Sequence, residues 1–224
     1  DAVSFVEETG LKVVVSTSDK APENQKLYAL HGEPGEHEVC FKTVNLGNPG
    51  PDDRFIYFIS DPPHLLKTIR NNLASSGSGS NTKLLWNNGH HLLWRHIADL
   101  YYQDQRNGLA RLPRLSRDHI SLTSHSIMKV KLAAQVLSCT VGSVMEAYGP
   151  EEAQETARFI KLVDRFFDCL NVRHLDEAHR KRKPDLRAYT EVEDVRFAFL
   201  ETVFLQYLQD WKLSVDQRIG YTRL

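Results

Sequence analysis

The feature that most constrains the fold is the stretch at residues 54–73, RFIYFISDPPHLLKTIRNNL, where a strand-like apolar run gives way to apolar residues at helical spacing. Residues 55–59 are five consecutive aromatic or β-branched side chains, too few for a helix and apolar on both faces, as a buried strand requires. Pro62 and Pro63 cannot donate hydrogen bonds in a sheet but suit the first turn of a helix. Leucine and isoleucine then recur at helical spacing over residues 64–73. The stretch therefore predicts a strand, a turn and a helix.

The residues before this stretch complete an alternating pattern. We expect a short helix at residues 2–9 that ends at Gly10, a strand at 12–16 and a helix at 22–31, followed by a polar loop that holds one short strand at 39–44. The order αβαβα favours a parallel sheet with at least one further strand upstream of Asp1. The fold class expected for the whole chain is thus α/β plus α.

The residues after this stretch have a helical period. Apolar side chains predict helices at residues 89–104, 127–148, 151–170 and 191–210, and ASSGSGSNT at 74–82 has the composition of a flexible linker. The polar stretch 173–186 contains the run RKRK at 180–183, which we interpret as a solvated loop in preference to a localisation signal or a nucleic-acid contact. We predict a first domain at 1–73, the linker at 74–82 and a helical domain at 83–224.

Composition narrows the class of protein further. The formal net charge of −1 gives no overall basic bias, so any contact with nucleic acid must be local or lie outside this sequence. Three widely spaced cysteines without a CxxC pair argue against a disulfide scaffold or a structural zinc site. No apolar run is long enough to span a bilayer, and we expect an intracellular protein without a membrane partner. Because the sequence does not begin with Met, we expect a piece of a longer protein.

Four segments in this order resemble the P-element transposases, the eukaryotic DNA transposases associated with an N-terminal THAP zinc finger. The segments are DPPHLLKTIRNNL (61–73), LLWRHIADLY (92–101), MKVKLAAQVLS (128–138) and FFDCLNVR (166–173). The resemblance implies an RNase H-like catalytic domain interrupted by a helical insertion domain that binds GTP. It also implies a nuclear protein that acts on transposon-end and target DNA, and it leaves homo-oligomerisation open.

The resemblance assigns catalysis to one residue of this chain. VVVSTSDKAPEN at 13–24 carries the family's second catalytic acid onto Asp19, a ligand of Mg²⁺ in the cleavage and joining of phosphodiesters. Local sequence alone favours a different role for Asp19, the capping of the helix that follows it. The other two acids would lie outside this chain, so we expect these residues alone to be inactive. Asp61 and His64 are interpreted as structural residues of the strand–helix junction.

The resemblance also assigns GTP-binding residues. Asp168 would accept the N1–H and N2–H₂ donors of guanine, a pattern that adenine does not present. Asn171, Lys129, Val130 and Ser138 would contact the base, the ribose or the phosphates. The sequence has no GxxxxGK[ST] motif, so we expect bound GTP to organise protein and DNA. On sequence alone, Asp168 would be an exposed acid near a helix end.

Three functions therefore remain open. The first is an internal part of a cut-and-paste DNA transposase, with Mg²⁺ and GTP as cofactors. The second is a domesticated descendant that binds or regulates DNA without cleaving it. The third is a stand-alone helical nucleotide-binding module. The first two are separated by the presence of the other two catalytic acids in the longer protein, and the third by nucleotide titration.

Overall fold

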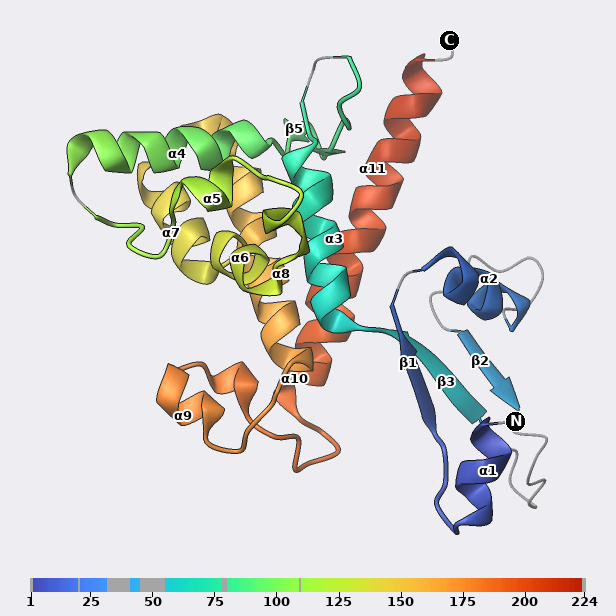
Figure 1. The fold of residues 1–224 in the computed structure, drawn as a ribbon. Coiled ribbons are helices and arrows are strands. Elements are labelled where there is room, and N and C mark those ends of the chain that lie inside the picture. The colour runs from blue at the N-terminus through green and yellow to red at the C-terminus, as the bar shows by residue number, and fades with distance from the viewer. Residues whose placement is uncertain are drawn as a thin grey trace. The chain divides into compact units, whose positions relative to one another are not determined.

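The computed structural model describes residues 2–19, 21–31, 41–44, 55–77, 80–108 and 110–222. The chain forms two compact units, Asp1–Leu65 and Leu66–Leu224, which are described separately (Figure 1). Within the described residues, no helix is both long and apolar enough to cross a membrane.

The first unit is a small mixed sheet with two helices. Its elements are α1 (Ala2–Glu8), β1 (Val15–Ser18), α2 (Pro22–Leu30), β2 (Phe41–Val44) and β3 (Phe55–Ser60). The strand order is β1-β3-β2, with β1 parallel and β2 antiparallel to the central strand. The predicted parallel pairing of the first strand with residues 55–59 is therefore confirmed. The short strand expected at 39–44 is present as β2, whereas most of the polar loop around it lies outside the described residues.

Tyr28 is the main anchor of α2 on this sheet. Its side chain is buried, and its ring lies 5.1 Å from that of Phe58 between centroids. Its hydroxyl donates a hydrogen bond to the carbonyl of Ile59 and lies 2.6 Å from the hydroxyl of Ser18. One side chain of α2 thus contacts both β1 and β3, which fixes the helix over the ends of the parallel pair.

The junction helix α3 (Pro62–Ala74) follows β3 as the sequence predicts. Asp61 accepts a hydrogen bond from the backbone N–H of His64 at 3.1 Å, so its expected role at the helix start is confirmed. The C-terminal part of α3 belongs to the second unit, where Leu66 and Leu73 are part of the core. Arg70 is fully buried beside them and donates to the carbonyls of residues 126 and 127. Burial lowers the pKa of this guanidinium.

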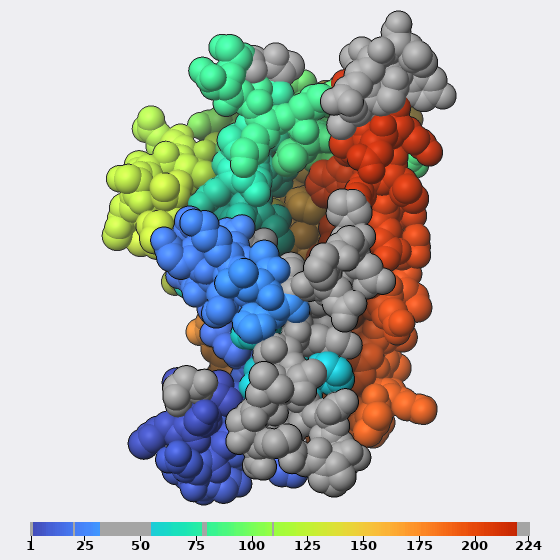
Figure 2. Space-filling view, turned by 90° about the vertical axis from the view of Figure 1, so that its right-hand side faces the viewer, coloured from blue at the N-terminus to red at the C-terminus, as the bar shows by residue number. Residues whose placement is uncertain are grey.

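The second unit is mainly helical. Its elements are the hairpin β4 (Trp86–Asn87) and β5 (His90–His91), α4 (Trp94–Asn107), α5 (Arg117–Ile120), α6 (Val130–Val136), α7 (Cys139–Tyr148), α8 (Gln154–Leu170), α9 (Glu177–Lys181), α10 (Val195–Ala198) and α11 (Gln206–Thr222). Single 3₁₀ turns lie at Ser126–Met128, Glu151–Ala153 and Pro184–Leu186, and a π-helical segment at Phe199–Leu205 joins α10 to α11. Helix α11 forms one side of the unit (red in Figure 2).

Four sequence predictions in this unit need correction. The single helix predicted at 127–148 is two helices, because Ser138 accepts the N–H of Val141 and begins α7 anew. The start predicted at residue 89 is wrong, since a β-hairpin precedes α4. The stretch 173–186 contains α9 and a 3₁₀ turn instead of an open loop. At the predicted linker, Ser76 accepts the N–H of Trp94 and pairs with Lys83, so this part is ordered within the second unit.

Helices α7 and α8 form the centre of the core. Ile160 and Val163 of α8 and Val141 of α7 are buried, in line with the predicted inward face of residues 151–170. Gly142 allows the two helices to approach closely, since a Cβ at this position would lie 2.6 Å from a side-chain carbon of Lys161. The paired helices hold the polar side of α8 in a fixed position.

Candidate functional site

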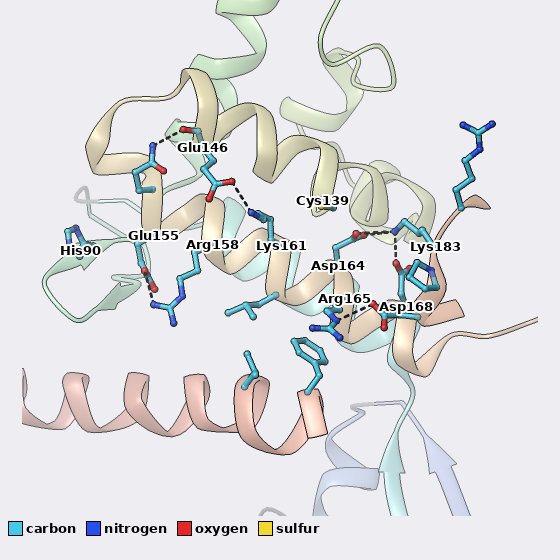
Figure 3. Close-up of a pocket in the computed structure, with 17 residues that line it drawn as sticks. His90, Cys139, Glu146, Glu155, Arg158, Lys161, Asp164, Arg165, Asp168 and Lys183 are labelled. Atoms are coloured by element: carbon cyan, nitrogen blue, oxygen red, sulfur yellow. Dashed lines mark hydrogen bonds and ion pairs between the residues drawn. The ribbon is translucent and has the colours of Figure 1, made fainter. Parts of the chain in front are cut away.

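A cavity of about 670 Å³ extends along α8 in the second unit (Figure 3). Side chains of α7, of the turn after α9, of the π-helical segment and of β5 complete its wall. Its charged lining consists of the cations Arg158, Lys161, Arg165, Arg182 and Lys183 and the acids Glu146, Glu155, Asp164, Asp168 and Asp185. A volume of this size is typical of small-ligand sites, and the mixed charge favours a polar ligand.

The periodicity of α8 explains why its charges gather on one side. Glu155, Arg158, Lys161, Arg165 and Asp168 recur every three or four residues, which places them on one face of the helix. The apolar residues between them point into the core. The sequence of α8 therefore specifies both the packing of the unit and the polar wall of the cavity.

Ion pairs connect this wall to neighbouring elements. Lys161 donates to a carboxylate oxygen of Glu146 on α7 at 2.8 Å, and Arg165 donates to Asp185 after α9 at 3.1 Å. Both pairs are partly exposed, and such pairs contribute little to stability. They fix side-chain positions around the cavity and leave it nearly neutral.

Lys183 is the most extensively paired cation of the cavity. Its ammonium donates to both carboxylate oxygens of Asp164 at 3.0 Å and to Asp168 at 2.6 Å. A lysine ammonium has three N–H donors, so these bonds use its full capacity. The preceding residue, Arg182, has a φ of 54° in the left-handed region. The chain thus turns sharply after α9 and directs Lys183 between the two acids.

The Asp168 carboxyl differs in its titration from an ordinary carboxyl group. Burial, followed by the charge of Asp164, raises the pKa of Asp168 to about 6, although Lys183 acts in the opposite direction. Burial lowers the pKa of Lys183, but the adjacent Asp164 and Asp168 outweigh this effect and raise it. Asp168 is therefore a carboxylate at neutral pH whose ionisation depends on a neighbouring lysine.

Glu155 marks the opposite end of the cavity (Figure 3). One of its carboxylate oxygens accepts hydrogen bonds from the Asn87 amide and the Tyr207 hydroxyl, both at 2.8 Å. Arg158 lies 3.8 Å from its other oxygen. Burial and the nearby Glu155 raise the pKa of Tyr207 far above its ordinary range. This end is thus held by a fixed network that joins β4, α8 and α11.

Asp168 is the one residue among the five sequence-predicted GTP ligands that lines the cavity, and all five are described. It is 9% exposed, in contrast to the exposed helix-end acid that local sequence alone suggests. Asn171 ends α8 one turn later, and its side-chain oxygen accepts a hydrogen bond from Arg173 at 3.4 Å. The structure therefore places Asn171 near Asp168 in sequence but outside the cavity wall.

The other three predicted ligands lie at two helix starts. Lys129 is exposed at the start of α6, and Val130 packs against the core. Ser138 caps α7, and Cys139 directly after it lines the cavity together with Asp168. The N-terminus of α7 and the last turns of α8 thus meet at the same cavity, although Ser138 itself does not line it.

Asp19 lies in the first unit at the end of β1. Its side chain is exposed and accepts hydrogen bonds from the N–H of Ala21 at 3.0 Å and from the Asn24 amide at 2.8 Å. The N-cap of α2 is Ala21 and has no side-chain cap, so the capping role that local sequence favours for Asp19 is wrong; its carboxylate instead stabilises the turn before the helix. No group of three or more histidine, cysteine or acidic residues that could hold a metal occurs in the described part of the chain.

Sequence reasoning missed Asp164 and Lys183 as site residues. The interpretation of the RKRK run as solvated is wrong for Lys183, whose pairing with two acids depends on the fold of the turn after α9. A usable signal was present, because Asp164 and Asp168 are four residues apart on one helix face and repel each other. Two such acids in a folded domain are stabilised by a nearby cation, but the sequence alone does not show which residue supplies it.

The second unit is thus a helical domain with a charged cavity along α8, and it follows a small α/β unit in the chain. Residues 63–183 match the family model described as the TNP-like, GTP-binding insertion domain, which covers more than half of the chain. The chain therefore belongs to this family.

Two further similarities are both to P element transposases. The chain is 34% identical over 167 residues to the transposable element P transposase of Drosophila melanogaster, across 72% of this chain and 20% of that protein. It is also similar to the Drosophila P element transposase strand transfer complex, with 32% identity and a TM-score of 0.62 over 76% of this chain and 37% of the solved chain. The chain thus spans about a fifth of the relative's length.

Proposed function

We propose that the second unit binds GTP in the cavity along α8, with Asp168 as the acceptor for the guanine edge. The single observation that carries this proposal is the position of Asp168: a mostly buried carboxylate on the cavity wall of a chain that belongs to a GTP-binding family. A carboxylate accepts the N1–H and N2–H₂ donors of guanine as a bidentate pair. Adenine lacks this donor pair, so the hydrogen bonds from the base to Asp168 would be lost and Lys183 would remain the partner of the carboxylate.

The α7 terminus gives the phosphates a place in the same cavity. The backbone N–H groups of its first turn and the positive end of the helix dipole favour a phosphate. Cys139 opens this turn, and Ser138 caps it. Lys129 and the Val130 backbone at the start of α6 are proposed as further phosphate or base contacts, and Asn171 as a contact to the base or ribose.

For the longer protein we propose a role in DNA transposition. The similarity to a P transposase and to a strand transfer complex supports DNA as a partner. A nuclear site of action is part of the same proposal. In this proposal the first unit is part of an RNase H-like domain, and Asp19 is one of three acids that hold Mg²⁺ for phosphodiester cleavage and joining. The parallel pairing of β1 with β3, with Asp19 directly after β1, is consistent with that role. In this proposal the other two acids lie outside the present chain.

Isothermal titration calorimetry tests nucleotide recognition directly. GTP, ATP and XTP are titrated into the chain and into Asp168→Asn. We expect GTP to bind at least tenfold more tightly than ATP, as about 1.4 kcal/mol of lost hydrogen bonding implies. The amide of Asp168→Asn should shift the preference toward XTP, because xanthine presents an acceptor where guanine presents a donor. Equal affinity for GTP and ATP, or an unchanged preference in the variant, would refute the assignment of Asp168.

A further inference from the structure

The connection between α4 and α5 concentrates positive charge. Residues 106–117, RNGLARLPRLSR, contain four arginines and no acid, in a chain whose formal net charge is −1. We call this segment the Arg loop, and the structure describes all of it except residue 109. It lies at the outer edge of the helical unit, where the chain leaves α4 and turns back to α5 (Figure 1). Its four cations are Arg106, Arg111, Arg114 and Arg117.

The Arg loop is anchored to the core. The buried carboxylate of Asp104 accepts the backbone N–H groups of Arg111 at 3.0 Å and Leu112 at 3.1 Å. The side chains of Leu112 and Leu115 are buried, at 2% and 8% exposure. Hydrogen bonds and buried leucine side chains thus both attach the loop to the helical unit. The backbone of the arginines between these contacts is therefore held in place.

The end of the loop is fixed by a second network. Ser116 and His119 form a reciprocal capping box at the start of α5. The other ring nitrogen of His119 lies 3.0 Å from the side-chain oxygen of Gln135 on α6. The backbone that carries Arg114 and Arg117 is therefore held on both sides, which lowers the entropy lost when these side chains bind a ligand.

The arginines themselves are not neutralised. None of the four forms an ion pair with any residue that the structure describes. In the α8 cavity, by contrast, Lys161, Arg165 and Lys183 each have an acidic partner. Arg106, Arg114 and Arg117 are exposed. Arg111 lies over the exposed ring of Tyr148, 3.6 Å from its centroid, an arrangement that orients a guanidinium without using its N–H donors. The loop thus presents four oriented or exposed cations to solvent.

We propose that the Arg loop is a contact surface for the phosphate backbone of duplex DNA. The guanidinium fork matches phosphate oxygens in pairs, and arginines without acidic partners lose no ion pair on binding. Because the loop is anchored, its four arginines stay close to one another, as contact with successive phosphates of a DNA backbone requires. The surface shares no residue with the α8 cavity, so it is independent of GTP binding.

The test is the salt dependence of DNA binding. Binding of a fluorescein-labelled 20-base-pair duplex to the whole chain is followed by fluorescence anisotropy between about 50 and 200 mM KCl. The double variant Arg114→Ala/Arg117→Ala removes two charges from exposed positions. Lys26→Ala/Lys212→Ala removes two exposed charges elsewhere, neither of which has an ion pair among the described residues, and is the matched control. Melting temperatures and GTP titrations of all three proteins report whether the fold and the cavity are intact.

The slope of log K against log salt should be shallower in the loop variant by about 0.9 for each lost phosphate contact, or about 1.8 in total. The control variant should keep the wild-type slope, and GTP affinity should be the same in all three proteins. A loop variant with the wild-type slope would overturn the proposal, as would an equal loss in the control. Failure of the wild-type chain to bind the duplex at 50 mM KCl, or equally tight binding of poly-glutamate, would also overturn it.

Discussion

Replacing Lys183 by methionine should change the pH dependence of GTP binding. The substitution keeps the length of the side chain and removes all three hydrogen bonds to Asp164 and Asp168. Of the charged groups that act on Asp168, Lys183 favours ionisation, and Asp164 and Asp185 oppose it. The variant therefore leaves Asp168 with burial and two like charges, and its pKa should rise above the value of about 6 in the natural chain.

The size of the effect follows from the ionised fraction of Asp168. With a pKa of about 6, this carboxyl is about 90% ionised at pH 7 and about 10% ionised at pH 5. If guanine binds only to the carboxylate, GTP affinity should fall roughly tenfold over this range. The midpoint of the loss should lie near pH 6 in the natural chain and higher in Lys183→Met.

The assay is calorimetric titration of GTP between pH 5 and 8. Inorganic triphosphate, measured in parallel, corrects for titration of the phosphates themselves. Lys161→Met is the matched control, because it removes a lysine from the same cavity wall whose partner is Glu146. Its midpoint should equal that of the natural chain. If Lys183→Met also keeps the natural midpoint, Lys183 does not support the ionisation of Asp168 and the reasoning fails.

Three further outcomes are expected from thermal or chemical unfolding. Gly142→Ala should destabilise the chain by about 1–3 kcal/mol, because the new methyl group would collide with Lys161 and approach the carbonyl of Ala157. Ser138→Ala should cost about 1 kcal/mol through loss of the α7 cap, and an unchanged stability would mean that the cap is not formed. Asp168 has a folded pKa above its unfolded value, so its stabilising contribution is complete below about pH 4 and is lost as the pH rises through about 6. Asp168→Asn should remove this slope between pH 4 and 6, and a slope that persists in the variant would assign it to another group.

Local patterns predicted the parts of the fold that depend on neighbouring residues. The apolar run at 55–59 and the following Pro-Pro pair specify β3 and α3 because both signals lie within one stretch. The 3.6-residue period of residues 151–170 likewise predicts α8 and its buried face. The break between α6 and α7 was missed because apolar periodicity continues across Ser138 and hides the new helix start.

The site was less accessible to sequence reasoning, because it depends on contacts between distant residues. Asp168 was identified through resemblance, whereas its burial becomes visible only when the turn after α9 covers the end of α8. The role of Lys183 depends on the left-handed backbone at Arg182, which no composition rule assigns to an arginine. The four arginines of the Arg loop and the lack of acids among residues 106–117 are readable in the sequence, but the anchoring by Asp104 is a tertiary contact.

The most direct test of the central claim is hydrogen–deuterium exchange of the whole chain with and without GTP, compared with ATP at the same concentration. GTP should protect amides in the first turn of α7, at Cys139 and the residues after it, and near the turn at Lys183, because both regions line the cavity with Asp168. ATP should leave these amides unchanged. Protection by GTP that excludes both regions, or equal protection by the two nucleotides, would contradict the assignment of the α8 cavity as a guanine nucleotide site.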